Sequence, residues 1–285
     1  AWPEMRFYVR DFRFLGLDLG ETRMEAYPIA GGLRFETVES SSEQLNFEAR
    51  GDWLETGSGS RSDFDIVLTS ESLGGIVNAL DLSSVLEGGQ TMVRYDAWWP
   101  GSPTAFKLAR LNGEMTFSVV DGRILNADPG AGRVLGLVSL GALPRRLALD
   151  FSDVFSSGFG FDQANGTIQF DDGTARTEDF ILESTAAQLS MVGESDLEAR
   201  EFDYLVTVRP GVSQALPVLG GIAAGPAGLA AGVALQELLR NALGEAAEAR
   251  YEITGPWSAP DVLRLDPGQE PMAEQSTAQA VTEGT

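Results

Sequence analysis

The stretch Gln44-Leu45-Asn46-Phe47-Glu48-Ala49-Arg50 decides the fold class of this chain, because apolar and polar residues alternate in it without a break. Successive side chains of a β-strand point to opposite faces of a sheet, so the alternation places Leu45, Phe47 and Ala49 on one face. The other face then carries only amide, carboxylate and guanidinium groups. One apolar face and one wet face are typical of antiparallel sheets.

The same alternation recurs near residues 63–68, 114–119, 147–151, 167–170 and 204–208. It predicts a mainly β protein in which the strands share one apolar face. The residues that we assign to this face, as candidates for contact with an apolar ligand, are Leu45, Phe47, Phe64, Ile66, Leu68, Met115, Phe117, Leu149, Phe151, Ile168 and Phe170.

Two Asp-Gly dipeptides, Asp121-Gly122 and Asp172-Gly173, are expected to form tight hairpin turns, because Gly tolerates the positive φ that such turns need. They belong to a repeat. Asn112-Gly113-Glu114-Met115-Thr116-Phe117 precedes the first dipeptide, and Asn165-Gly166-Thr167-Ile168-Gln169-Phe170 precedes the second. Repeated hairpins predict an extended sheet that grows by adding similar units.

The composition excludes several classes of function. The chain has neither Cys nor His, which removes disulfides, thiolate or imidazole metal sites and the commonest general base. Its net charge of −22 and single lysine, Lys107, argue against nucleic-acid binding. The carboxylate pairs Asp63/Asp65 and Asp171/Asp172 lack the spacing of a calcium loop or of a known catalytic motif. We therefore expect no enzyme activity, no metal and no cofactor.

Residues 210–236 carry no charge, in contrast to the acidic remainder of the chain. The run is long enough to span a bilayer, but its proline and glycine residues break helices. We expect a helical element over residues 210–243 that packs under the sheet or contacts a membrane or a partner protein through Leu229, Val233, Leu235, Leu238, Leu239 and Leu243. Residues 266–285 are acidic and poor in large apolar groups, which predicts a disordered tail.

Two further helical segments are expected, at residues 70–86 and 132–143. Pro144 ends the second, and Arg145 and Arg146 follow it. An arginine pair matches the geometry of phosphate oxygens, so these two residues are candidates for contact with a phosphate group. The alternative is a solvated pair that interacts only with the helix dipole.

Several stretches resemble the C-terminal region of the YhdP-type proteins of the AsmA-like group. The resemblance begins at about Trp99 and ends near Leu265. The residues that carry it are Gly132-Arg133-Val134-Leu135-Gly136-Leu137, Leu140-Gly141-Ala142-Leu143-Pro144-Arg145-Arg146-Leu147, Leu149-Asp150-Phe151-Ser152-Asp153-Val154-Phe155, Asp203-Tyr204, Val206-Thr207-Val208-Arg209-Pro210, Tyr251, Gly255 and Trp257.

The resemblance implies both a fold and a function. Proteins of this family are anchored in the inner membrane of diderm bacteria and bridge the periplasm as a β-sheet curled into an open trough. Their apolar inner face is thought to carry phospholipid toward the outer membrane. Residues 1–265 would then be the C-terminal trough of a longer periplasmic protein, with phospholipid as cargo, Arg145 and Arg146 near headgroups, and the outer membrane or an envelope protein at the C-terminal end. The family implies no catalytic residue and no nucleotide.

Three alternatives remain at this point. The alternation by itself favours an ordinary sandwich, in which a second sheet closes the apolar face. A trough could also serve as a structural or regulatory envelope module that assists outer-membrane assembly only through protein contacts. A carbohydrate-active enzyme or lectin on a β scaffold would need a polar cleft lined by aromatic rings, which the alternation does not indicate.

Overall fold

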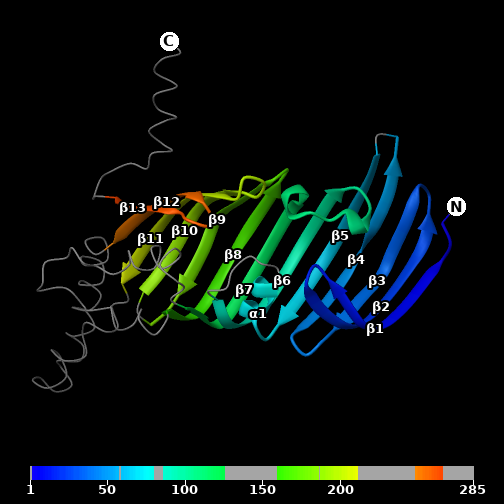
Figure 1. Ribbon diagram of the computed structural model, residues 1–285, viewed down its shortest axis with the longest axis horizontal. Coiled ribbons are helices and arrows are strands. Elements are labelled where there is room, and N and C mark those ends of the chain that lie inside the picture. The colour runs from blue at the N-terminus through cyan, green and yellow to red at the C-terminus, as the bar shows by residue number, and fades with distance from the viewer. Residues whose placement is uncertain are drawn as a thin grey trace, which may run out of the picture.

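The computed structural model describes residues 2–57, 59–79, 86–125, 159–185, 187–210 and 248–265. Their strands form a single sheet of 13 strands, in which every strand pairs with the next one along the chain (Figure 1). All of the pairings are antiparallel. The fold is therefore one long meander.

The strands are 5 to 15 residues long, and the first seven precede residue 125. These are β1 (Met5–Phe14), β2 (Leu17–Ile29), β3 (Gly32–Ser41), β4 (Leu45–Thr56), β5 (Gly59–Ser70), β6 (Leu86–Pro100) and β7 (Asn112–Ile124). The others are β8 (Phe159–Asp171), β9 (Thr174–Glu183), β10 (Ala187–Asp196), β11 (Glu201–Pro210), β12 (Ala249–Pro256) and β13 (Asp261–Leu265).

Short helices interrupt the meander at two places within the described residues. Helix α1 (Leu73–Ala79) follows β5, and the Ser72 hydroxyl accepts a hydrogen bond from the Gly75 backbone N–H at its start. Two 3₁₀ turns, η1 (Pro103–Ala105) and η2 (Leu108–Arg110), connect β6 to β7. Helix α1 confirms the helical prediction for residues 70–86 in part.

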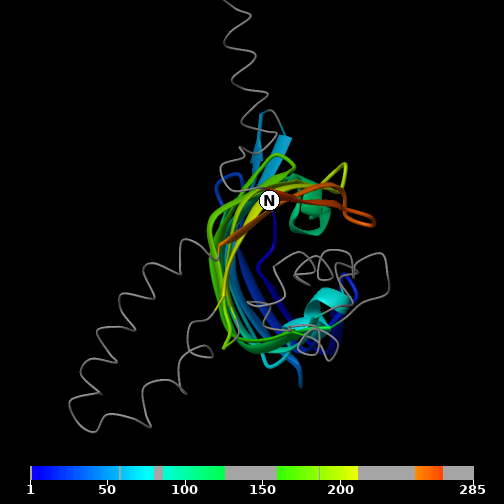
Figure 2. The same ribbon diagram turned by 90° about the vertical axis from the view of Figure 1, so that its left-hand side faces the viewer.

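The sheet is curled across its width, and it does not close into a barrel. Figure 2 looks along the row of strands and shows the curved section, with α1 and the turns after β6 on its concave side. Ile76 of α1 packs against Leu45 and Leu68, so the apolar face of the strands is the concave one. The predicted open trough is confirmed, and the two-sheet sandwich is wrong for the described strands, which all belong to one sheet.

The two Asp-Gly dipeptides have different structures. Asp172 and Gly173 form the two-residue turn between β8 and β9, both with positive φ, as predicted. The hairpin prediction for Asp121-Gly122 is wrong, because both residues lie inside β7. Asp121 has a φ of 56° and interrupts the pairing of β7, so this dipeptide forms an irregularity in a continuing strand.

Other expectations lie outside the described residues. They are the helical segment at residues 132–143, the tail at 266–285, and the helical element at 210–243 apart from Pro210, which ends β11.

Gly51 provides a test of this sheet, because its backbone lies against β5. A Cβ atom at this position would lie 2.1 Å from the Asp63 carbonyl oxygen and 2.7 Å from the Phe64 ring. We expect Gly51→Ala to lower the free energy of unfolding by about 1–3 kcal/mol, as overpacking does. Chemical denaturation measures this change. Gly160→Ala in β8 is the matched control, since no atom lies within 4 Å of its added Cβ, and an equal loss there would contradict the register.

Candidate functional site

The register aligns the apolar side chains of neighbouring strands into rows that cross the strands. Residues that pair directly across two strands lie on the same face of a sheet. The pairing gives two central rows, which we call the floor of the trough. One row is Phe47, Leu68, Val93, Phe117 and Gly166, and the other is Val38, Ala49, Ile66, Tyr95, Met115 and Ile168.

Most of the floor residues are only partly buried, whereas the rows beside them are buried. One flanking row is Ser70, Thr91, Val119, Ala164 and Leu182. The other contains Phe35, Phe64, Ala97, Phe170 and Ala175, with Gly51 and Gly113 between them. The concave face therefore has packed sides and a floor that is partly open, which a closed sandwich core would not have.

The concave face is nearly free of charge. None of the side chains in the floor and flanking rows between β3 and β9 is ionisable, apart from the Tyr95 phenol. Burial raises the pKa of Tyr95, and its hydroxyl donates to the Asn112 carbonyl oxygen at 3.3 Å. Other buried hydroxyl groups pair with each other, as in Thr22 with Ser40 at 2.8 Å. An apolar ligand would thus meet few groups that need water.

The structure places nine of the residues assigned to the apolar face, and all nine lie on the concave face. Phe47, Ile66, Leu68, Met115, Phe117 and Ile168 belong to the floor, and Leu45, Phe64 and Phe170 lie beside it. Leu149, Phe151, Arg145 and Arg146 lie outside the described residues. So do Leu229, Val233, Leu235, Leu238, Leu239 and Leu243.

Sequence reasoning missed the contribution of β6. Val93, Tyr95, Ala97 and Trp99 all lie on the concave face, and they alternate with Arg94, Asp96 and Trp98. The period-two signal was therefore present in the sequence. The adjacent tryptophans divide between the two faces: Trp99 is buried in the trough, and Arg61 stacks on the Trp98 ring at 4.1 Å on the convex side.

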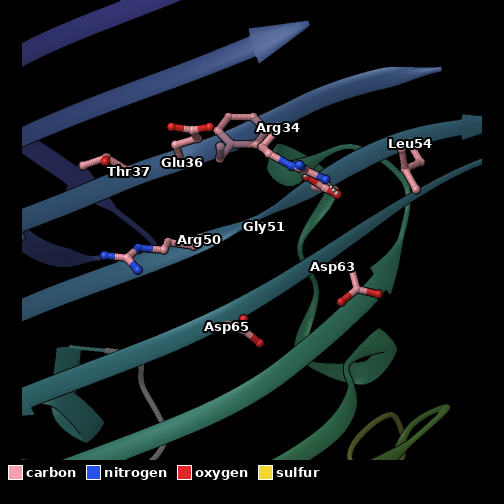
Figure 3. Close-up of a pocket in the computed structure, with 10 residues that line it drawn as sticks. Arg34, Glu36, Thr37, Arg50, Gly51, Leu54, Asp63 and Asp65 are labelled. Atoms are coloured by element: carbon pink, nitrogen blue, oxygen red, sulfur yellow. Dashed lines mark hydrogen bonds and ion pairs between the residues drawn. The ribbon is translucent and has the colours of Figure 1, made fainter. Parts of the chain in front are cut away.

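The convex face is polar and rich in ion pairs. Arg34 binds the Asp52 carboxylate through two hydrogen bonds of 2.9 and 3.0 Å, and Arg176 binds Glu194 at 3.0 Å. A shallow pocket opens on this face over β3, β4 and β5 (Figure 3). It forms at a β-bulge, where Glu36 and Thr37 together lie opposite Arg50. Its lining is mostly charged, so it differs in chemistry from the trough.

Comparison with known proteins identifies the family. Residues 1–262 match the model of the family described as YhdP protein. The chain belongs to the YhdP family. A curated member, the intermembrane phospholipid transporter YhdP of Escherichia coli (strain K12), is 28% identical over 263 residues. That match covers 92% of this chain and 21% of the relative, so the chain spans about a fifth of the relative's length. No solved structure matches.

Two features are absent from the part of the chain that the structure describes. None of the helices in this part of the chain is long and apolar enough to cross a membrane. Within the same residues, no group of three or more acidic side chains is arranged to hold a metal ion.

The carboxylates of Asp65 and Asp96 face each other on the convex side, across β5 and β6. Their repulsion predicts that the stability of the fold depends on pH. Desolvation by neighbouring side chains, and then the charge and hydrogen bond of Asp96, raise the pKa of Asp65 above its usual value. A raised carboxyl pKa in the folded state costs stability as the pH rises through that pKa. We expect Asp65→Asn to raise the melting temperature at neutral pH and to have little effect near pH 3.

Melting curves between pH 3 and pH 8 check this prediction. Asp52→Asn is the opposing control, because it removes the paired acceptor of Arg34 and should lower the melting temperature at neutral pH. A lower melting temperature of Asp65→Asn at neutral pH would contradict the repulsion between Asp65 and Asp96.

Proposed function

We propose that this chain forms part of a periplasmic bridge that carries phospholipid between the inner and outer membranes, with the acyl chains lying along the concave face. The proposal rests on membership of the YhdP family and on the name of the Escherichia coli relative, an intermembrane phospholipid transporter. It also rests on a trough whose floor is apolar, uncharged and partly open.

The partly open floor is the observation that carries the proposal. Phe117, Met115 and Ile168 are incompletely covered, although they lie in the middle of the apolar face. Each buried CH₂ group contributes about 0.8 kcal/mol, so an acyl chain laid on this floor is stabilised at every strand that it crosses. Thirteen strands spaced about 4.8 Å apart give a path of roughly 58 Å across the sheet.

Movement along the floor would be a diffusive slide. Neighbouring positions offer similar aliphatic and aromatic surfaces, so no single position holds an acyl chain much more tightly than the next. The charged headgroup stays at the open side, because placing it against the uncharged floor would leave it without partners. The direction and the energy of transport come from elsewhere, since the chain has no nucleotide-binding motif. We propose no catalytic role.

We further propose that residues 210–243 contact the outer membrane or an envelope protein, and that Arg145 and Arg146 contact headgroups. The absence of charge in residues 210–236 and the phosphate affinity of arginine pairs motivate these two assignments.

A photo-crosslinking residue at Phe117 tests the cargo. We expect it to capture phospholipid in cells, because Phe117 belongs to the floor. The matched control is the same probe at the neighbouring Thr116, which points to the convex face and is exposed. Mass spectrometry of the adducts identifies the lipid. Equal capture at both positions would indicate mere proximity to a membrane and would sink the proposal.

Ile168→Asp separates lipid transport from a purely structural role. An aspartate on the floor should abolish lipid capture and transport while the protein stays folded, since Ile168 is only partly buried. The matched control is Gln169→Asp on the convex face. Unimpaired envelope function in the Ile168→Asp variant, with lipid capture lost, would favour a structural module that acts through protein contacts.

The proposed contact of residues 210–243 has its own test, which is Leu235→Glu combined with Leu239→Glu. If these residues contact a membrane or a partner, the variant should keep its melting temperature and lose both liposome association and function. A melting temperature lowered by many degrees, in a protein that never associates with liposomes, would show that the segment packs under the sheet.

A further inference from the structure

The first hairpin does not follow the curvature of the remaining sheet. Its pairing changes register twice: β1 has an extra residue between Val9 and Phe12, and β2 has one at Leu19. Gly20, beside the second irregularity, has a φ of 64°, and its backbone N–H donates a hydrogen bond to the Asp18 carboxylate. Bulges bend a strand and increase its twist. The distal half of the hairpin, residues 10–20, therefore turns toward the concave side (Figure 2).

The trough has two rims, which are the edges at which its strands begin and end. The rim at which β4 starts and β5 ends anchors this half of the hairpin. Phe14, Leu17 and Leu19 pack in one cluster with Leu45, Leu68 and Ile76. The tip also abuts the end of α1, because a Cβ atom on Gly16 would lie 2.6 Å from the Ala79 carbonyl oxygen. Leu45 begins β4, so this contact lies at the rim where β4 starts.

The same hairpin also contacts a segment from the opposite rim, at which β6 ends. The Phe14 ring meets the Phe106 ring edge-to-face, with 6.4 Å between the ring centroids. Phe106 lies between η1 and η2 and packs on Trp99, near the end of β6, with 5.5 Å between centroids. Trp99 stacks in turn on Phe64 at 5.4 Å.

These contacts join the two rims across the open side. Trp53 shares a cross-strand row with Trp99 through Ser62, and it lies eight positions after Leu45 on β4. Eight positions correspond to about 26 Å of extended strand. Phe14 belongs to the cluster of Leu45 at one end of this stretch of strand, and through Phe106 it is connected to Trp99 at the other end. Residues 10–20 and 103–110 therefore form a strap over the floor at β4 to β6.

We propose that this strap is a gate for the headgroup of the transported lipid. The inference rests on the proposed function, in which acyl chains lie on the floor and the polar headgroup stays at the open side. Acyl chains pass beneath the strap along the floor row of Ala49, Ile66 and Tyr95, because Leu68 of the other row packs in the cluster of Phe14. A charged headgroup meets an aromatic barrier there, and no ionisable group other than the Tyr95 phenol lies on the floor or in the flanking rows below to receive it.

The gate opens by separating Phe14 from Phe106. At this junction two rings meet edge-to-face, and the two segments that carry them are each anchored to their own rim. The hairpin can therefore swing away without unpairing the sheet from β3 to β13. The size of the opening would decide which headgroups pass.

A reversible lock across the junction tests the gate. The chain has no Cys, so Phe14→Cys with Phe106→Cys introduces a unique thiol pair that a reducible bismaleimide can join. The readout is phospholipid capture in the intact protein by photo-crosslinking residues at Met24 or Ile168. These two positions lie in the same cross-strand row on opposite sides of the strap.

We expect the lock to change the ratio of capture at Met24 to capture at Ile168 severalfold, and reduction to restore the ratio. The matched control joins Phe12→Cys to Phe14→Cys, whose native rings are also 6.4 Å apart but lie in the same hairpin. An unchanged ratio in the locked protein, or an equal change in the control, would overturn the gate. Absence of lipid capture at both positions before locking would instead overturn the proposed function.

The Phe14→Ala variant tests the open state of the gate. Without the ring the junction stays open, so the capture ratio should move closer to one than in the parent protein. Circular dichroism confirms that the sheet is intact. A ratio identical to that of the parent, in a folded variant, would show that the strap only packs against the rims.

Discussion

The continuous antiparallel register of the sheet is the constraint on which the rest of this structure depends. Period-two alternation within one strand produces an apolar face only for that strand. Pairing such as Ile66 with Ala49 and Tyr95, and Tyr95 with Met115, brings the apolar faces of successive strands together. A slip of one residue at any pairing would put polar or charged side chains into the floor and interrupt it. The register therefore determines both how the apolar side chains of neighbouring strands pack and whether the floor is continuous.

Among the residues that the structure describes, no second sheet lies across the floor, and this distinguishes the trough from a β-sandwich. Packing is concentrated where short segments cover the concave face. Helix α1 covers Leu45 at one rim, and the η1–η2 segment covers Trp99 at the other. Between them, the floor keeps side chains such as Phe117 and Ile168 partly open. Stability and ligand access are thus supplied by different parts of the same face.

Much of this arrangement could be predicted from the sequence, since alternation assigns each residue to a face before any pairing is known. It placed Phe64, Met115 and Ile168 correctly. Alternation could not decide between a sandwich and a trough, because both need one apolar face. Asp121-Gly122 was misjudged, since Asp-Gly suits both a hairpin turn and an irregularity within a strand. The strap was not predictable, because it depends on two bulges and on a ring contact between Phe14 and Phe106, which are distant in sequence.

The central claim is that the concave floor holds acyl chains, and the lipid content of the purified protein tests it most directly. Native mass spectrometry of the protein, extracted without added lipid, should reveal bound phospholipid. A variant with aspartate at both Phe117 and Ile168 should remain folded and carry none. Absence of lipid from the parent protein, or equal lipid in the folded double variant, would contradict the account.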